Sequence, residues 1–463
     1  MTNYRSSTLS LISAVLLISE VLVFNASELS ASANYEDQVT TTPTTISNQQ
    51  IYPQTFFLDP SLLVNAKKIV NNGNNSILQE ALTQLLFDAD HFLTKKPSSV
   101  MDKTQLPPSG NKHDFLSQNP YRWQNPDTPN GLPYIFRDGK SNPEADSIPD
   151  KRAMDDMVDT VKILSLAYYF TDNNEYASKA VELLRVWFLD NATRMNPNLD
   201  YSEMIPGQDK SHSSGIIAGR SLVDIIDSIG MIQNSLSWTK KDQHEVELWF
   251  SKYLNWLLNS DVGKEESQKI NNHGTYYDVQ VSSFALFLNR TDVTESIFKA
   301  ITHELTPATL VSTPKVIAVK IQPDGRQPFE LARPKSLAYS MFNLLGLFKL
   351  ASIGQHVGID LWNYKTPEGA GLQKALDYLL PYLIKDKSWP YEQIKGISTR
   401  DLADLLCQAS MHYQNNPAYI EAYNSINRTD IPMNIENYVT CVSLNVVKQT
   451  ERGDSDTRKS LTG

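Results

Sequence analysis

Apolar residues recur at helical spacing along most of this 463-residue chain, and this periodicity constrains the fold more than any other feature. An amphipathic helix repeats its buried stripe about every 3.6 residues. The stripe is clear around residues 154–164 and 222–229. Strand-like alternation is scarce, and Val316–Ile321 is the one ambiguous segment. The same pattern predicts further helices over residues 62–95, 174–189, 239–258, 274–288, 292–304, 334–352, 370–385 and 399–413.

Roughly ten helices joined by short links predict an all-α fold. We expect helical hairpins arranged as an incomplete α/α toroid, with long irregular loops over a central cleft. An ordinary helical solenoid is the alternative, although no fixed-period repeat is present. Hydrophobic residues make up 41% of the chain, which is enough for a sizeable core. Thr239–Asp242 predicts an N-cap for the helix that follows it.

Two long segments interrupt the helical pattern, over residues 102–150 and 193–219. Both are rich in residues typical of irregular structure, and both also carry aromatic and cationic side chains. Long irregular segments inside a compact domain are usually functional or disordered. Their aromatic and cationic content favours a functional interpretation.

The two ends of the chain differ in composition from the part between them. Residues 1–33 resemble a secretory signal peptide, with Arg5, an apolar run over Leu9–Phe24 and a small-residue cleavage site at Ala31–Ala33. A membrane anchor is the alternative, but the run is short and contains Glu20. We therefore expect a secreted, extracellular protein with no stable membrane association after cleavage. The predicted division is a signal at 1–33, a flexible lead-in at 34–50, one α/α-toroid domain at 51–449 and a disordered tail at 450–463.

Secretion fits two further features of the sequence. Acceptor sequons for N-glycosylation occur at Asn74, Asn191, Asn289 and Asn427. The chain has only two cysteines, Cys407 and Cys441. They form either one disulfide in an oxidising compartment or two buried thiols.

The charge balance argues against a nucleic-acid partner. Lys and Arg total 42 against 52 Asp and Glu, so the formal net charge is −10. Nucleic-acid binders are normally basic. An acidic protein can still bind an anionic polymer if positive charge is focused in a cleft.

The segment Asn271–Gln280 gathers amides, an imidazole and phenols into ten residues. His273, Tyr276, Tyr277 and Gln280 would share one face of a helix. No Cys lies nearby, so a zinc site is not indicated. Amide and imidazole groups can hydrogen-bond a carboxylate and move a proton beside it. The alternative is a core histidine with ordinary packing tyrosines.

A second candidate constellation runs from Gln322 to Tyr339. Pro334 suits the first position of a helix, which would place Arg333 at the helix start. Tyr339 and Asn343 then face away from the main apolar stripe and would face the cavity of a toroid. Alternatively, Arg333 forms a structural salt bridge with Glu330, and Tyr339 fills space.

Together with the Pro107–Asp114 and Arg194–Tyr201 segments, these residues resemble the alginate-lyase superfamily of α/α-toroid polysaccharide lyases. The resemblance covers roughly residues 100–365. It implies that Asn272 (or Asn271), His273 and Arg333 hold and neutralise a uronate carboxylate. It also implies that Tyr339 protonates the leaving oxygen, and that no metal or organic cofactor is needed. The polymer would be alginate, polymannuronate or glucuronan.

The base of the reaction is left open by the sequence. In syn elimination Tyr339 also removes the C5 proton, whereas in anti elimination His273 removes it. A basic tyrosine needs a lowered pKa, which Arg333 and Arg326 could provide. Arg326 could instead bind a neighbouring uronate or remain in the Asp324–Gly325 turn.

The irregular segments would supply the walls of the substrate cleft. We expect cationic side chains to meet carboxylates and aromatic ones to stack on sugar faces. Solvated loop charges are the alternative for each, and His212 and Arg220 are weaker candidates. The expected substrate-binding residues are Asn271, Tyr277, Arg326, Lys112, His113, Tyr121, Trp123 and Arg137, with Arg122 as a further cation.

Two other functions compete with elimination. A glycoside hydrolase on the same toroid would need two placed carboxyl groups. Asp155, Asp156, Asp224 and Asp227 are available, but they resemble a first helical turn and a solvent-exposed helix face. A non-catalytic polysaccharide-binding protein is the other alternative.

Overall fold

The computed structural model describes residues 52–73, 75–303 and 315–426. The predicted signal, lead-in and C-terminal tail lie outside these residues, as do Asn74, Asn427 and Cys441. The described residues belong to one compact unit that begins at Tyr52.

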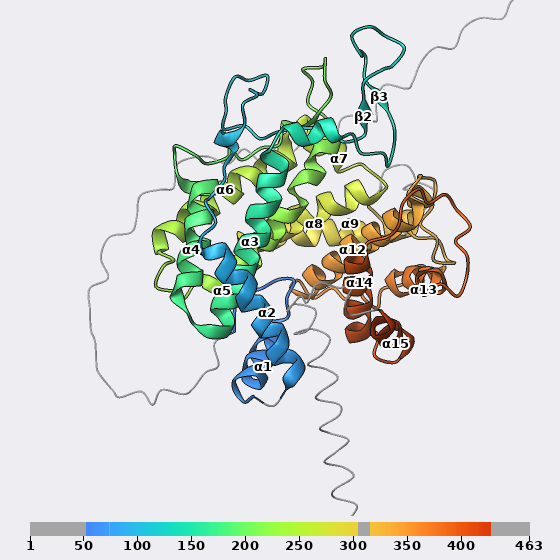
Figure 1. The fold of residues 1–463 in the computed structure, drawn as a ribbon. Coiled ribbons are helices and arrows are strands. Elements are labelled where there is room, and N and C mark those ends of the chain that lie inside the picture. The colour runs from blue at the N-terminus through green and yellow to red at the C-terminus, as the bar shows by residue number, and fades with distance from the viewer. Residues whose placement is uncertain (1–51, 74, 304–314, 427–463) are drawn as a thin grey trace, which may run out of the picture. The chain divides into compact units, whose positions relative to one another are not determined.

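The elements are coloured along the chain in Figure 1. The α-helices are α1 (Pro60–Asn71), α2 (Ser76–Leu93), α3 (Asp150–Thr171), α4 (Asn174–Leu184), α5 (Val223–Ile232), α6 (Lys240–Asn259), α7 (Asp261–Glu266), α8 (Asn272–Phe287), α9 (Thr291–Ile301), α10 (Ile317–Lys320), α11 (Pro328–Leu331), α12 (Ser336–Gln355), α13 (Leu372–Leu383), α14 (Thr399–His412) and α15 (Ala418–Ser425).

Short irregular helices and strands complete the described structure. The strands β1 (Leu116–Gln118) and β4 (Tyr201–Met204) pair in parallel. The strands β2 (Arg122–Trp123) and β3 (Ile135–Phe136) form an antiparallel hairpin. The remaining elements are η1 (Val100–Asp102), η2 (Pro143–Ser147), η3 (Arg185–Leu189) and η4 (Ser213–Leu222). The ambiguous segment Val316–Ile321 contains the single helical turn α10, so it is not a strand.

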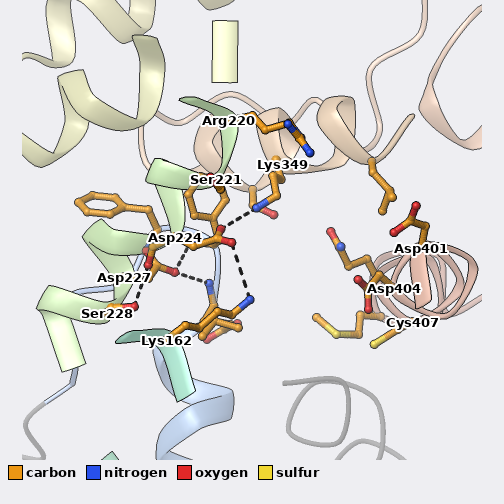
Figure 2. Close-up of a pocket in the computed structure, with 18 of the residues that line it drawn as sticks. Lys162, Arg220, Ser221, Asp224, Asp227, Ser228, Lys349, Asp401, Asp404 and Cys407 are labelled. Atoms are coloured by element: carbon orange, nitrogen blue, oxygen red, sulfur yellow. Dashed lines mark hydrogen bonds and ion pairs between the residues drawn. The ribbon is translucent and has the colours of Figure 1, made fainter. Parts of the chain in front are cut away.

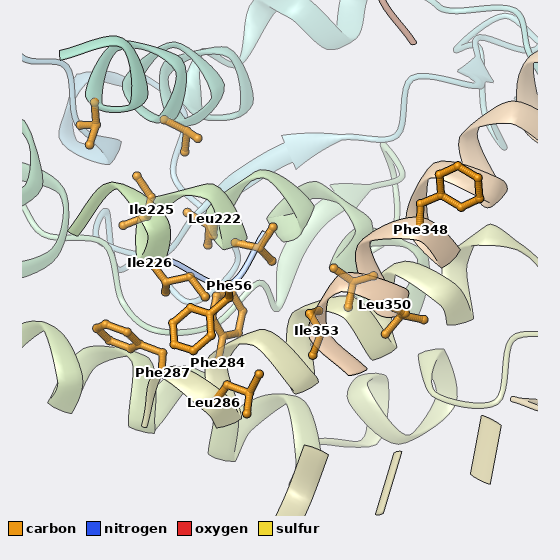
Figure 3. Packing of buried hydrophobic residues seen from close by; sticks show 14 of the residues in the cluster. Phe56, Leu222, Ile225, Ile226, Phe284, Leu286, Phe287, Phe348, Leu350 and Ile353 are labelled. Carbon is orange, nitrogen blue, oxygen red and sulfur yellow. The ribbon is translucent and has the colours of Figure 1, made fainter. Parts of the chain in front are cut away.

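The helices form an incomplete α/α toroid, as predicted. An inner series packs in the order α3, α5, α8, α12, α14, and each helix of the series contacts the next. A second helix lies against most of them: α4 contacts α3, α6 and α9 contact α8, α13 contacts α12, and α15 contacts α14. Figure 3 shows apolar side chains of α5, α8 and α12 meeting in one cluster.

Helix α8 lies at the centre of this arrangement. Every one of its residues except His273 is buried. A helix that is enclosed on all sides is a core element rather than an amphipathic one. Helix α12 is also mostly buried. It is the one described helix long and apolar enough to cross a membrane, and 67% of its most apolar stretch is covered within the fold. His273, at the start of α8, is therefore the residue of this helix that remains partly accessible to solvent.

The irregular segment 102–150 is held at both ends by a fully buried ion pair. Lys103 Nζ lies 2.8 Å from Asp150 Oδ2, and both side chains are inaccessible to solvent. The same ammonium donates to the carbonyl oxygens of Val100 (2.6 Å) and Lys112 (2.7 Å). Because an unpaired buried charge is costly, this pair fixes where the segment leaves and rejoins the helices.

Several predicted boundaries are wrong for identifiable reasons. The helix predicted over 62–95 is two helices, α1 and α2, because the Asn71–Asn75 stretch contains Gly73 at φ +68°. The predicted helix over 174–189 ends at Leu184 and continues as the π-helical turn η3. Helix α12 begins at Ser336, not at Pro334, because the 386–398 loop pairs with its N-terminus. Arg333 therefore lies in the preceding turn.

Two polar side chains expected to be accessible are buried. Asn343 donates to Gln327 Oε1 (2.8 Å) and accepts from Thr275 Oγ1 (2.7 Å), so it joins α8 to α12 rather than facing a cavity. Asp227, expected on a solvent face, accepts the backbone N–H groups of residues 56, 57 and 58 at 2.7–3.0 Å. It ties the N-terminal end of the described chain to α5.

The N-cap predicted at Thr239 is confirmed and generates a stability test. Thr239 and Asp242 form a capping box, and Arg185 binds the Asp242 carboxylate through two nitrogens at 2.8 and 2.7 Å. Although burial opposes ionisation, the hydrogen bonds from Arg185 and Thr239 lower the pKa of Asp242 to about 2.

We predict that Asp242→Ala lowers the free energy of unfolding at neutral pH by about 2 kcal/mol. A carboxyl group whose pKa is lower in the folded state than in the unfolded state stabilises the fold at pH values above the unfolded pKa, near 3.8. This contribution is lost as the pH falls toward 2. Urea unfolding measures the change. Asp292→Ala is the matched control, because Asp292 pairs with Arg290 in an exposed position. Equal losses in both variants would contradict the account.

Candidate active site

The Asn271–His273 segment forms the N-terminus of α8, and Asn271 serves as its cap. The Asn271 side chain accepts the backbone N–H of His273 at 3.2 Å, which satisfies a donor that the helix leaves unpaired. The Asn271 carbonyl accepts from the buried Lys320 ammonium at 3.2 Å. Asn271 thus caps α8 in this structure, and its contact with substrate stays a prediction.

Asn272 is held by a buried carboxylate. The backbone N–H of Asn272 donates to Glu330 Oε1 (2.6 Å), and its side-chain Nδ2 donates to Glu330 Oε2 (2.7 Å). Both residues are 1% exposed. Burial raises the pKa of Glu330, while the bonds from Asn272 act in the opposite direction. The alternative prediction paired Glu330 with Arg333, but the Glu330 carboxylate binds Asn272 instead.

His273 is oriented by a second buried carboxylate. Its Nδ1 lies 2.6 Å from Glu266 Oε1, and the Glu266 side chain is inaccessible to solvent. Burial tends to lower the pKa of His273, but the hydrogen bond and charge of Glu266 outweigh it, so the pKa is raised. The raised pKa favours the protonated imidazole near neutral pH. The ring is 21% exposed, so it remains accessible from the cleft.

A third carboxylate, Glu203, lies close enough to His273 for the two charges to interact. Burial raises the pKa of Glu203, and the charges of His273 and Arg220 oppose that rise. Its backbone adopts φ +53°, which is uncommon for a residue other than glycine. Asn119 Nδ2 donates to its carboxylate at 2.9 Å. Backbone outliers of this kind cluster at functional sites.

Tyr339 belongs to a compact group with Tyr121, Asp138 and Arg333. The Tyr339 hydroxyl donates to the Tyr121 hydroxyl at 2.9 Å and lies 3.3 Å from Asp138 Oδ1. The Arg333 guanidinium stacks 3.7 Å from the centre of the Tyr339 ring. Arg333 also binds both Asp138 oxygens, at 3.0 and 2.7 Å. Tyr121, predicted from the 102–150 segment, is thereby brought to Tyr339.

The pKa of Tyr339 does not follow the sequence-based expectation in this structure. Burial raises it, the Tyr121 hydrogen bond and the Asp138 charge raise it further, and Arg333 opposes them without prevailing. Tyr339 is therefore a protonated phenol here, which suits a proton donor. Burial is the largest of these causes, and the charge of the Asp138 carboxylate, which binds Arg333, adds to it.

The two groups form one site. Arg333 lies close enough to His273 for its charge to lower the pKa of the imidazole. Asn272 and His273 come from the start of α8. Arg333 lies in the turn before α12 and Tyr339 in the first turn of α12, and these two helices pack on each other. The structure thus brings together the four residues predicted as catalytic.

The other predicted substrate residues are dispersed. Tyr277 is 3% exposed and donates to the Leu257 carbonyl at 2.9 Å, so its position does not support substrate contact. Arg326 binds Asp324 within its exposed turn. His113 Nδ1 lies 2.6 Å from the Arg194 carbonyl oxygen. Lys112 is partly exposed, and its carbonyl accepts from Lys103.

The β2–β3 hairpin presents paired cations and rings. The Arg137 guanidinium lies 5.4 Å from the Trp123 ring centre, and Arg122 lies 5.1 Å from the Phe136 ring. Trp123 also donates to the Lys140 carbonyl at 2.8 Å. Since the hairpin continues into Tyr121 and Asp138, it is physically attached to the site. It remains our prediction for a substrate wall.

A separate cavity of about 710 Å³ lies among α3, α5, α12 and α14 (Figure 2). None of the four predicted catalytic residues lines it. Asp224 is paired there with Lys349 at 2.9 Å and with Lys162 at 3.8 Å. Because Asp224 is paired and Asp227 binds backbone N–H groups, neither supplies the free carboxyl group that a hydrolase needs.

Nothing in the described part of the chain indicates a metal centre. Its His, Cys, Asp and Glu residues do not gather in a group of three or more able to hold a metal ion. The cations and proton donors of the site are side chains of the protein. The described helices thus form an α/α toroid that carries an amide, an imidazole, a guanidinium and a phenol in one cluster.

Comparison with known proteins identifies the family. The alginate lyase family model matches residues 99–389, which contain all four predicted catalytic residues. An alginate lyase from Bacteroides ovatus is 35% identical, with a TM-score of 0.76, over 84% of this chain and 99% of its own. Alginate lyase A1-III from Sphingomonas species A1, in complex with a tetrasaccharide, shares the fold at 14% identity and a TM-score of 0.51, over 85% and 97% of the two chains. No curated protein sequence matches. The chain belongs to the alginate lyase family.

Sequence reasoning missed Asp138, Glu203 and Glu266 as members of the site. Asp138 directly follows Arg137 in a segment predicted to be functional. This position was the only sequence feature that could have indicated Asp138. Glu203 and Glu266 stand 70 and 7 residues before His273 and match no motif that we recognised. Their contribution depends on tertiary packing.

We predict that Glu266→Gln lowers the pKa of His273, because the amide removes the charge that favours the imidazolium. In the native pair, the raised pKa of His273 stabilises the fold fully at pH values below the unfolded pKa of about 6.5. This contribution is lost as the pH rises through the pKa of the folded state. Titration of the His273 ring by NMR measures the change. Glu265→Gln is the control, since Glu265 pairs with Lys269 at the surface. An unchanged His273 titration in Glu266→Gln would rule out this role.

Proposed function

We propose that this protein degrades alginate, or a closely related uronate polymer such as glucuronan, by β-elimination. The observation that carries the proposal is the Arg333 guanidinium, which stacks on the Tyr339 ring and lies close enough to His273 for the two charges to interact. Support also comes from the family match and from the similar B. ovatus alginate lyase. The predicted anionic substrate fits a site whose reactive groups are cations and proton donors.

The proposed reaction begins with neutralisation of the uronate carboxylate by Asn272, His273 and Arg333. Neutralisation acidifies the C5 proton and stabilises the enolate-like intermediate. A base removes that proton, the C4–O bond breaks, and Tyr339 protonates the leaving oxygen. The electron pair of the C5–H bond becomes the C4=C5 double bond of the new non-reducing end.

The charge state of His273 favours Tyr339 as the base as well. An anti elimination needs a neutral imidazole, and Glu266 opposes that form. Tyr339 acts as a base only after its phenol proton has been released to solvent. The Arg333 guanidinium stacked on its ring would stabilise the resulting phenolate. We therefore favour syn elimination.

We also propose secretion, on the sequence of residues 1–33. Cys407 is disulfide-bonded, and Cys441 is the only other cysteine of the chain. Disulfides persist in oxidising compartments, so this bond fits an extracellular enzyme. Asn191 lies in an exposed turn, and Asn289 is also exposed; both remain predicted glycosylation sites.

We predict that Tyr339→Phe lowers the elimination rate at least about 100-fold while the polymer still binds. The ring and its stacking with Arg333 are kept, whereas the transferable proton is lost. The ultraviolet absorbance of the conjugated double bond measures the rate on polymannuronate, polyguluronate, glucuronan and hyaluronan. Full activity in the variant would remove Tyr339 from the mechanism. Reducing ends released by the native enzyme without ultraviolet absorbance would indicate hydrolysis.

A second prediction concerns Asp138. In Asp138→Asn the negative charge beside Tyr339 is removed, so the pKa of the phenol falls. We expect the alkaline rise of kcat/KM to move to lower pH by roughly one unit. Asp127→Asn, in the exposed part of the same loop, is the control. A pH profile identical to that of the native enzyme would show that Asp138 does not restrain Tyr339.

A further inference from the structure

Four aromatic side chains gather beside the start of α12, outside the catalytic cluster. Trp389 lies 4.9 Å from Tyr382, 5.3 Å from Tyr391 and 6.3 Å from Tyr378, measured between ring centres. All four are partly exposed. Trp389 and Tyr378 pack against the edge of the hydrophobic core, whereas Tyr382 and Tyr391 pack on Trp389. We refer to these four residues as the aromatic ledge.

The ledge is fixed to the helix that carries Tyr339. Trp389 Nε1 donates to the Ser336 hydroxyl at 2.8 Å, and the Ser336 N–H donates to the Glu392 carbonyl at 3.2 Å. The Gln393 side chain accepts the Leu337 N–H at 2.9 Å. Because Ser336 precedes Tyr339 by one helical turn, the ledge has a set position relative to the site.

Positive charge continues from the site to the ledge. Burial lowers the pKa of Lys335, and the nearby charges of Lys395 and Arg333 lower it further, so these three cations lie close together. Arg326 lies close enough to Tyr391 and Tyr378 to interact with both side chains. The chain as a whole carries −10, so a local run of cations is a specific feature.

Arg326 is able to exchange its partner. Its side chain is 45% exposed and pairs with Asp324, which is 50% exposed. Exposed ion pairs contribute little to stability. A uronate carboxylate can therefore compete with Asp324 for the guanidinium, in the paired geometry that favours arginine.

We propose that the aromatic ledge and Arg326 form a subsite for a further uronate of the polymer, beyond the sugars that contact Tyr339. A sugar ring presents an apolar C–H face and, in a uronate, one carboxylate. Tyr391 supplies an aromatic surface for the first, and Arg326 supplies a cation for the second. This inference rests on the proposed polysaccharide substrate. It adds a binding site for a part of a long polysaccharide that lies beyond the catalytic residues.

The alternative is that the four rings only anchor the 386–398 loop. Anchoring accounts for Trp389 and Tyr378, which reach Ser336 and the core. Anchoring of the loop does not explain why Tyr391 lies outside the core, next to the exposed side chain of Arg326. The two interpretations differ in their effect on long and short substrates.

The test compares the polymer with the shortest oligouronate that the native enzyme cleaves. We expect Arg326→Ala and Tyr391→Ala each to raise the KM for the polymer roughly fivefold to tenfold, with kcat and the short-substrate kinetics unchanged. Tyr391→Phe keeps the ring and is expected to retain most of the affinity. Arg290→Ala is the matched control, since Arg290 also pairs with an exposed aspartate two residues away.

Three results would overturn the subsite. They are an unchanged polymer KM in both alanine variants, an equal loss on long and short substrates, and an equal rise in KM in Arg290→Ala. Arg326 is exposed, so Arg326→Ala keeps the test valid if Tyr391→Ala does not fold. If the native enzyme shows no elimination, the proposed function fails instead. The ledge is then tested directly in native gels that contain polymannuronate, by comparing the retardation of the native chain with that of Arg326→Ala. Equal retardation of the two proteins counts against the ledge.

Discussion

The clamp of Glu330 on Asn272 is the interaction on which the rest of the site depends. One buried carboxylate accepts both the backbone and the side-chain N–H of the residue that begins α8. Glu330 lies three residues before Arg333 and nine before Tyr339. The clamp therefore holds Asn272 and His273, on α8, in a fixed position relative to Arg333 and Tyr339. The Asn343–Thr275 bond reinforces the same pair of helices.

Three cationic or polar groups of the site each have an acidic partner in the unliganded enzyme. Asn272 is bound by Glu330, His273 by Glu266 and Arg333 by Asp138. The first two carboxylates are buried and orient their partners permanently. Asp138 differs because it is more exposed, lies in an irregular segment and occupies the cation that a substrate carboxylate would need. In the proposed reaction, a substrate carboxylate would have to replace Asp138 on Arg333.

The fold and the four central residues were predictable from the sequence because they depend on local patterns. Helical periodicity gave α6 and α14 close to their bounds and located parts of α3 and α5. The resemblance to a family singled out His273 and Tyr339. The remaining contacts join segments far apart in the chain, such as Asp138 to Arg333 and Tyr121 to Tyr339. No periodicity or spacing encodes these contacts. The polarity of Tyr277 and Asn343 was misleading for the same reason, since tertiary partners satisfy both inside the core.

The most direct measurement is a crystal structure of the full chain, as the Tyr339→Phe variant, with a bound uronate tetrasaccharide. We predict one uronate carboxylate between Asn272, His273 and Arg333, with Asp138 displaced from Arg333. The substituted aromatic ring on α12 should face C5 and the glycosidic oxygen. A saccharide bound instead in the cavity among α3, α5, α12 and α14, with the Asp138–Arg333 pair intact, would contradict the proposed site.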